Sequence, residues 1–448
     1  MPDGRFPLGA AVTTAGLDGS PHQLLRTLRE QEPVSWLPAL GGWLVTSHDL
    51  ASRVMRDSKL FTVDDPRFST ARVVGPSMLS LDGAAHRRHR DPFTQAFRGA
   101  AASAQLESFA VATAGRLVAG IREDGRAELR RSLAGPLAVG VVAELLGLAE
   151  TEPAVILSWY DAIVSAVTAL SAEPSRGGPP VAASSAGEMP SPASAGSTGS
   201  TSGTTGSTGS TPGTTGSTTT STSSSTTTAS TGSPYQAGRQ AFGALRASIE
   251  EVIGRRGASS LLAAAAGSGG LSTDEVVSNA AVLMFGGIET TEGMICNAIL
   301  HLLSDPGQLG LVLADRQLLS GAVEESLRLE PSAAVVDRYA TADVPLGAAR
   351  IRRGDLVIVS IAAANRDPAV FADPDRFDIR RVNARQNLGF ARGPHFCPGA
   401  QLARTETCAA IEAMLDQLPG VRLDQEQPAS PRGLVFRKPS TLHVRWPL

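Results

Sequence analysis

The longest apolar pattern in the chain lies between Ser272 and Asp305. It opens with Ser272-Thr-Asp-Glu275, a capping box in which a hydroxyl and a carboxylate satisfy backbone N–H groups at a helix start. Asp305-Pro-Gly supplies the stop. The pattern predicts a helix of roughly thirty residues, or about 45 Å. Its middle is apolar around the full circumference, which is typical of a helix that crosses the interior of a domain.

A low-complexity segment separates two further helical patterns, at residues 159–164 and 238–253. From about 177 to 233 the chain consists largely of Gly, Ser, Thr and Pro. So little apolar surface cannot offset the entropy of ordering, and we expect a disordered segment. The pattern alone leaves open whether it links two domains or is a long loop within one.

Composition narrows the class of protein. The 448 residues carry a net charge of −3, which gives no general attraction to nucleic acid or anionic membranes. The N-terminus lacks a charged region followed by an apolar run, so we expect a cytoplasmic protein with no membrane segment. The three cysteines cannot build a disulfide framework, and no CxxC pair is present for zinc.

One cysteine lies in a sequence that favours metal binding. Cys397 belongs to Phe390-Ala-Arg-Gly393-Pro-His395-Phe-Cys397-Pro-Gly399, directly before a helix start. Backbone N–H groups and the positive end of the helix dipole would then point at the sulfur. Such surroundings favour the thiolate, the form that binds metals. The alternative is a buried, inert cysteine that packs as a small apolar side chain.

The spacing FxxGxHxCxG resembles the haem-ligand loop of the cytochrome P-450 family. The resemblance implies that Cys397 is the axial ligand of the iron in haem b (iron protoporphyrin IX), with Phe390 and Gly399 in the same cofactor-binding loop. Two positions depart from the family's usual pattern, Ala391 and Pro398. Pro398 removes one N–H that could contact the sulfur, so we expect it to tune the iron potential without preventing binding.

The middle of the long helix contains Gly286-Gly287-Ile-Glu289-Thr290-Thr291. Each mid-helix glycine costs about 1 kcal/mol relative to alanine, so close approach of a flat cofactor or a local widening would explain the pair. The segment resembles the family's acid–alcohol motif, which implies that Thr290 orders hydrogen bonds on the oxygen side of the iron and Glu289 feeds protons from solvent. The alternative is packing glycines, a surface glutamate and threonines that bond back to their own helix.

Two motifs resemble elements that hold the family's cysteine segment in place. Glu325-Ser-Leu-Arg328 matches ExxR, and Phe371-Ala-Asp-Pro374-Asp-Arg376-Phe377 matches the downstream meander. The resemblance implies a buried Glu-Arg-Arg network in which the meander arginine, Arg376, joins Glu325 and Arg328.

Four basic residues resemble the family's propionate ligands. His86 and Arg90 form the HxxxR pair, Arg338 matches the RxA position, and His395 lies in the cysteine loop. The alternatives are a solvated basic turn for the first pair and a strand-edge charge for Arg338. Arg87, Arg88 and His89 should face outward, where they could attract an acidic redox partner.

The resemblance covers nearly the whole of residues 1–448 and decides the role of the insert. Haem-binding residues lie on both sides of it, so residues 177–233 should form a disordered loop between two lid helices of one domain. A longer flexible loop costs only about 0.6 kcal/mol per doubling. The implied fold is mainly α with a minor β region, a single triangular domain.

The implied function is that of a haem-thiolate monooxygenase. It would insert one oxygen atom from O2 into an apolar small molecule, by hydroxylation, in secondary-metabolite biosynthesis. Ferredoxin and ferredoxin reductase would supply electrons, and we expect a monomer. Oxidative coupling, desaturation or epoxidation on the same fold are alternatives, as is a non-catalytic haem-binding sensor or recruiting protein. The expected substrate walls are apolar but identify no molecule; they lie at 63–78, 283–289, 333–336 and 433–436.

Overall fold

The computed structural model describes residues 5–98, 100–172, 233–255, 261–267 and 269–448. Met1–Pro174 and Ser233–Leu448 form one compact unit. The segment expected to form a disordered loop lies outside the described residues, except for Ser233. That expectation therefore stays a prediction.

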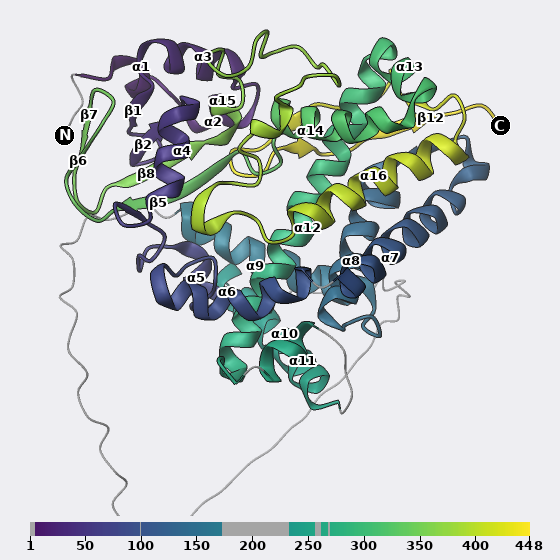
Figure 1. The fold of residues 1–448 in the computed structure, drawn as a ribbon, viewed down its shortest axis with the longest axis horizontal. Helices are drawn as coiled ribbons and strands as arrows, with labels where there is room; N and C mark the ends of the chain where they lie inside the picture. Colours follow the sequence, from purple (N-terminus) through teal and green to yellow (C-terminus); the bar gives the residue numbers. More distant parts are fainter. Residues whose placement is uncertain (1–4, 99, 173–232, 256–260, 268) are drawn as a thin grey trace, which may run out of the picture. The chain divides into compact units, whose positions relative to one another are not determined.

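Helices make up most of the described chain (Figure 1). The apolar periodicity of the sequence places most of them around the long helix α12. They are α1 (Pro7–Ala10), α2 (Thr14–Asp18), α3 (His22–Gln31), α4 (His48–Arg56), α5 (Ser69–Val74), α6 (Gly83–Arg98), α7 (Ala100–Ala119), α8 (Gly135–Leu146), α9 (Pro153–Ala172), α10 (Pro234–Gly254), α11 (Leu261–Gly267), α12 (Thr273–Ser304), α13 (Pro306–Ala314), α14 (Leu319–Leu329), α15 (Ile361–Ala364) and α16 (Ala400–Gln417).

The strands form one five-stranded sheet and three small sheets. The large sheet has the order β1-β2-β8-β5-β3, in which β2 and β8 are parallel and the other pairs antiparallel. The small sheets are β10-β11, β4-β12-β9 and β6-β7. The strands are β1 (Val34–Leu37), β2 (Gly42–Val45), β3 (Phe61–Thr62), β4 (Arg126–Glu128), β5 (Val335–Ala340), β6 (Val344–Leu346), β7 (Ala349–Ile351), β8 (Leu356–Ser360), β9 (Arg422–Leu423), β10 (Pro431–Arg432), β11 (Lys438–Pro439) and β12 (His443–Arg445).

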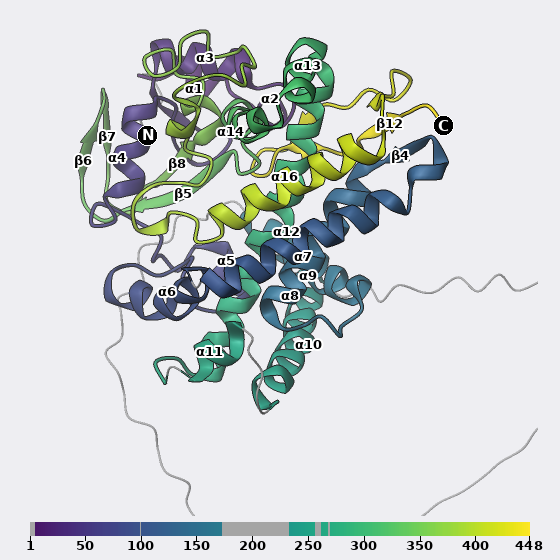
Figure 2. The same cartoon turned by 45° about the vertical axis from the view of Figure 1, so that its right-hand side comes forward.

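Helix α12 is the central element of the core, as its all-round apolar pattern predicts. The capping box forms, with the Ser272 hydroxyl and the Glu275 carboxylate each accepting the other residue's backbone N–H. Residues of α12 contribute to two apolar clusters, one with α8, α9 and α10 and the other with α7 and α16. Figure 2 shows α16 running alongside α7, and both helices pack together in the structure. The cysteine that precedes α16 is thereby fixed relative to α12.

Helix α9 contains a stretch, Pro153–Leu170, that by length and composition could cross a membrane. A third of this window (33%) is buried inside the protein. Buried helices of soluble proteins pass the same test, so within the described chain this stretch is only a weak indication of a membrane segment.

A fully buried ion pair joins α14 to the loop that leads to the cysteine segment. Glu325 and Arg328 are each 0% exposed and form two hydrogen bonds of 2.8 Å. The third member is Arg381, whose Nε lies 2.9 Å from Glu325 Oε1. The expectation that Arg376 fills this place is wrong, because its side chain is exposed and only its backbone carbonyl accepts from Arg328.

Replacing Arg381 by Ala should lower the free energy of unfolding by about 3 kcal/mol, because it leaves Glu325 buried with one charge partner fewer. Arg376→Ala, the matched control, should change it by less than about 0.5 kcal/mol. Chemical denaturation of both variants measures the difference. Equal losses would show that the exposed arginine carries the network after all.

A histidine in α12 makes stability depend on pH. His301 Nδ1 lies 2.9 Å from Ser326 Oγ, and burial lowers the pKa of His301 from 6.5 to about 4. The unfolded chain therefore binds a proton that the folded protein does not, between those two values. The folded protein should lose up to about 1.4 kcal/mol of stability per pH unit as the pH falls through this window.

Replacing His301 by Gln removes this proton linkage. The stability of the variant should fall less steeply than that of the parent between pH 6.5 and about 4, which denaturation curves at several pH values measure. Parallel pH profiles would contradict the assignment.

Candidate active site

The cysteine loop is folded back on itself and held against α4. Gly393 has a φ of +72°, and a Cβ there would come within 2.8 Å of the Arg56 Cα and the Met55 carbonyl. Both observations require glycine at this position of the motif. The Cys397 N–H donates to the Phe390 carbonyl at 2.9 Å, so the first and eighth positions of the motif meet.

The sulfur of Cys397 receives a backbone hydrogen bond from Gly399, next to the start of α16. This confirms the predicted direction of the N–H group. Burial nevertheless raises the pKa of the Cys397 thiol, and Gly399, Arg90 and Arg404 only partly oppose this. In the protein alone, burial of the thiol thus outweighs the N–H group and the two cations, and thiolate ligation stays a prediction. A metal that coordinates a thiol removes its proton.

Two of the predicted propionate ligands lie in direct contact. The rings of His86 and His395 have their centroids 4.4 Å apart, although 309 positions separate the residues. Within the described chain, His86 Nε2 is buried without a hydrogen-bond partner. Burial, with His395 and Arg90 nearby, lowers the pKa of His86 to about 4. A buried polar atom of this kind calls for an acceptor or donor from a ligand.

The other two predicted ligands lie on different elements, α6 and β5. Arg90, on α6, donates to the carbonyl of Phe396 beside the cysteine. Arg338, on β5, is 4% exposed and donates to the Asp337 carbonyl at 2.7 Å. Burial lowers the pKa of Arg338, while the charge of Asp82 opposes this. Arg338 is therefore a buried cation and not a strand-edge charge.

The sequence interpretation missed Asp82, which joins three segments of this site. Its carboxylate accepts hydrogen bonds from His395 Nε2 at 3.0 Å, Thr62 Oγ1 at 2.7 Å and the Val63 N–H at 2.9 Å. Burial would raise the pKa of Asp82, but these hydrogen bonds outweigh it and lower the pKa. The available signal was an aspartate directly before the start of α6.

The two glycines of α12 have different roles. A Cβ at Gly287 would lie 2.6 Å from Val142 Cγ2, so this glycine allows α8 to pack closely. A Cβ at Gly286 would meet nothing within 4 Å, so open space adjoins the helix there. The Thr290 hydroxyl donates to the Gly286 carbonyl beside that space. The packing explanation holds for Gly287, and local room remains the explanation for Gly286.

Glu289 is not a surface residue but part of an ion-pair network. Lys438 Nζ lies 2.8 Å from Glu289 Oε1, and the Tyr160 hydroxyl donates to Oε2. Both partners come from elements distant in the chain, β11 and α9. Lys438 is one of only two lysines in the chain, and this rarity was the one hint in the sequence that it has a particular role.

The basic cluster on α6 faces outward only in part, because Arg87 and Arg88 are exposed as expected but His89 is not. His89 is 1% exposed, and its Nε2 lies 3.2 Å from Glu275 at the start of α12. Arg88 also pairs with Glu275 and donates to the Gly270 carbonyl at 2.9 Å. Arg87 alone of the three is exposed without such a role. Arg88 and His89 therefore join α6 to the start of α12.

Three of the expected substrate walls come together. The rings of Phe285 and Phe436 have their centroids 5.4 Å apart, and Ala333 forms a backbone bridge with Phe436. Met78 lies in the apolar cluster that contains much of α12, and its N–H donates to Asn279 at 2.7 Å. Apolar side chains from the segments at 63–78 and 433–436 therefore pack against α12.

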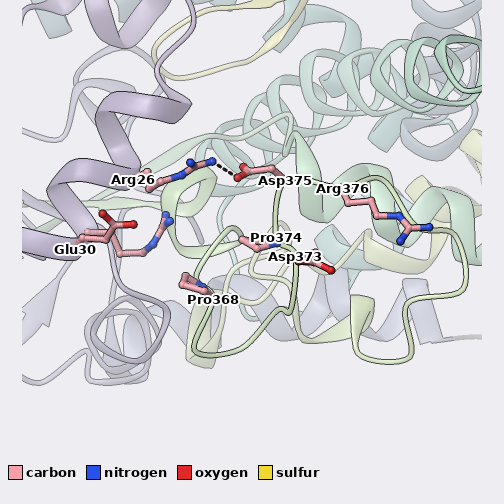
Figure 3. A pocket seen from close by; sticks show the side chains of 8 residues that line it. Arg26, Glu30, Pro368, Asp373, Pro374, Asp375 and Arg376 are labelled. Carbon is pink, nitrogen blue, oxygen red and sulfur yellow. Dashed lines mark hydrogen bonds and ion pairs between the residues drawn. The ribbon is translucent and has the colours of Figure 1, made fainter.

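A surface pocket of about 370 Å³ lies away from these residues, between α3 and the meander loop (Figure 3). Arg26 and Asp375 form an ion pair at its edge. Charges of both signs line it, so it lacks the apolar walls of a substrate site. The lining residues are Arg26, Arg29, Glu30, Pro368, Asp373, Pro374, Asp375 and Arg376.

Comparison with known proteins decides the family. A family model described as Cytochrome P450 matches residues 312–443. The chain is 30% identical over 444 residues to the cytochrome P450 monooxygenase PikC of Streptomyces venezuelae, covering 95% of this chain and 91% of PikC. It is 31% identical over 440 residues to the mycinamicin IV hydroxylase/epoxidase of Micromonospora griseorubida, covering 94% of each. The crystal structure of CalO2 matches with a TM-score of 0.77 and 27% identity, covering 97% and 99%.

The chain belongs to the cytochrome P450 family. As a P450 it binds haem b and is a monooxygenase, and the predicted mainly α fold with a minor β region is confirmed. The residues present fit the cofactor: a sulfur with a hydrogen bond from Gly399, an unpartnered His86 Nε2 and open space at Gly286. The role of each residue belongs to the proposal that follows.

Proposed function

We propose that Cys397 binds the haem iron through its sulfur and that His86, Arg90, Arg338 and His395 hold the propionates. The observation that carries this proposal is the contact between the His86 and His395 rings at 4.4 Å, because it brings the HxxxR pair to the cysteine loop. Arg90 supports it by donating to the carbonyl next to Cys397. Two cationic or donating groups for each carboxylate is favourable charge-assisted pairing.

Phe390 and Gly399 complete the proposed loop. The Phe390 carbonyl accepts the N–H of Cys397, and the guanidinium of Arg404 lies 4.5 Å above the Phe390 ring. Gly399 directs its own N–H at the sulfur. Both residues therefore set the direction of the Cys397 side chain.

The bound haem supplies the chemistry that activates O2 and inserts one oxygen atom into substrate. In this proposal Glu289 carries protons inward from the Tyr160 and Lys438 side, and Thr290 passes them on through Oγ1. The hydroxyl of Thr290 lies beside the open space at Gly286, and its own proton is held by the Gly286 carbonyl. Its oxygen lone pairs therefore remain available to accept a proton.

An apolar secondary metabolite is the proposed substrate, with hydroxylation as the reaction. The walls formed by Phe285, Phe436 and Met78 are apolar, and they contribute no charge that would select a polar ligand. Relatives are named for mycinamicin IV and for 20-oxo-5-O-mycaminosyltylactone, so these compounds are the first probes. A shift of the haem absorption on titration with each compound would report binding.

The redox partner is proposed to be an acidic ferredoxin, itself reduced by a ferredoxin reductase. Its docking site would be the end of α4, where Arg53 and Arg56 are exposed and form no ion pair within the described chain. The Arg56 backbone touches Gly393 of the cysteine loop, so electrons arriving there have a short path. We further propose that the protein is a cytoplasmic monomer.

Replacing Cys397 by Ser should abolish the band near 450 nm that thiolate ligation gives the ferrous–CO complex. The matched control is Cys408→Ser, on α16, which should keep the band. A difference spectrum of the reduced, CO-treated proteins decides between them. A band retained by the Cys397 variant would overturn the ligand assignment.

Replacing both Arg53 and Arg56 by Glu should slow reduction by ferredoxin at least tenfold at low salt, since opposite charges steer the encounter. Arg239→Glu on α10 makes half of this charge change at another exposed position and should have little effect. Stopped-flow reduction measures the rates, and titration with substrate should be unchanged. Equal rates for all variants would show that docking occurs elsewhere.

A further inference from the structure

Lys438 lies between two carboxylates of α12. Its Nζ is 2.8 Å from Glu289 Oε1 and 3.1 Å from Glu292 Oε2. The Lys438 side chain is 11% exposed, against 15% for Glu289 and 9% for Glu292. Solvent therefore screens these contacts far less than it screens a surface ion pair. An ammonium with three donors can serve both carboxylates at once, which the planar fork of an arginine does less readily.

The two carboxylates do not depend on Lys438 equally. Glu292 has a second cation, because Arg130 Nε pairs with Glu292 Oε1, and Arg130 also donates to the Ser440 carbonyl at 3.0 Å. For Glu289, Lys438 is the cation in direct contact within the described chain. Loss of Lys438 would leave Glu292 paired and Glu289 without its ion-pair partner.

The second oxygen of Glu289 is held from α9. Burial, followed by the charge of Glu289, raises the pKa of Tyr160, so the phenol stays neutral and donates its proton to Oε2. With one donor on each oxygen, the Glu289 carboxylate has a defined position. A preorganised carboxylate avoids reorganisation when a proton has to move.

Charged and titratable groups surround Glu289 from four elements. Besides those already named, burial and the charge of Glu289 raise the pKa of Asp161, and burial also raises the pKa of Cys296. These two groups add no positive charge, so the ammonium and guanidinium balance the acids. The full set is Tyr160 and Asp161 on α9, Arg130 on the π-helical turn before α8, Glu292 and Cys296 on α12, and Lys438 on β11.

We propose that Lys438 is a positioning residue for proton delivery, acting through Glu289. This role of Lys438 rests on the proposed role of Glu289 and identifies the group that keeps the Glu289 carboxylate in place. Lys438 neither contacts the haem nor gives up its proton; its ammonium orients the carboxylate that transfers one. Without it, Glu289 keeps only the Tyr160 hydrogen bond. O2 that has taken two electrons from the ferredoxin then leaves with two protons from solvent as hydrogen peroxide before substrate is oxidised.

The test compares Lys438→Met with Lys438→Arg and Lys59→Met in the holoenzyme with a turned-over substrate. Lys438→Met should lower kcat about tenfold, below the hundredfold that misplacing a catalytic group can cost, with KM unchanged. The share of electrons lost to peroxide should rise at least twofold. Lys438→Arg should recover at least half of kcat. Lys59→Met, which changes the other lysine of the chain, should match the parent in both measurements.

Glu289→Gln separates this inference from the proposal beneath it. If Lys438 acts through Glu289, adding Lys438→Met to Glu289→Gln should lower kcat less than twofold further. The same substitution should lower the melting temperature less in the Glu289→Gln background than in the parent, because the ion pair is already broken. This second readout does not depend on turnover.

The outcomes for these variants distinguish the role of Lys438 from the role of Glu289. Unchanged kcat and peroxide yield for Lys438→Met, or an equal tenfold loss in the Glu289→Gln background, would overturn the role of Lys438 and leave Glu289 unaffected. Full activity of Glu289→Gln would instead overturn the proposed proton route, and the role of Lys438 with it. If Lys438→Met fails to bind haem, the double variant Lys438→Met/Glu292→Gln takes its place. It removes one positive and one negative charge, so the charge balance is restored. The outcomes named above then apply to this double variant.

Discussion

The Glu325 carboxylate is fully buried and remains acceptable there only because two guanidinium groups and a backbone N–H surround it. Arg328 and Arg381 in turn donate to backbone carbonyls of the meander, so one buried charge fixes α14 and a long irregular loop together. That loop continues directly into the segment that carries Cys397. Without this network the meander would lose the buried charges that hold it to α14.

A second constraint comes from helix α12. It is buried along most of its length, yet it carries Glu289 and Glu292 one turn apart. Like charges at this spacing repel one another. Ion pairs with Lys438 and Arg130 offset this repulsion. Glu289 is thus held by the same kind of interaction that holds the loop before Cys397. In both places a carboxylate on a helix pairs with cationic side chains from other parts of the chain.

Short-range features of the site could be read from the sequence, because they depend on neighbours in the chain. The capping box of α12 and the direction of the Gly399 N–H in the cysteine loop agree with the expectations. The approach of His86 to His395 is long-range and was expected only from the family resemblance. Expectations were wrong where the spacing of residues along the chain does not specify which side chains meet in space. Arg381 replaces Arg376 because the meander turns its later arginine inward, and His89 is buried because α6 packs against the start of α12.

The sequence by itself determined the haem-ligand loop and the long central helix, since each is a pattern within a few dozen residues, and it determined the family through the order of several such motifs along the chain. Only the tertiary structure decided which charges meet. Lys438 and Tyr160 reach Glu289 from strands and helices well over a hundred positions away, and Asp82 reaches His395 across 313. Ion pairs of this kind leave no periodic signal, because a buried charge needs a partner in space and not at any fixed distance along the chain.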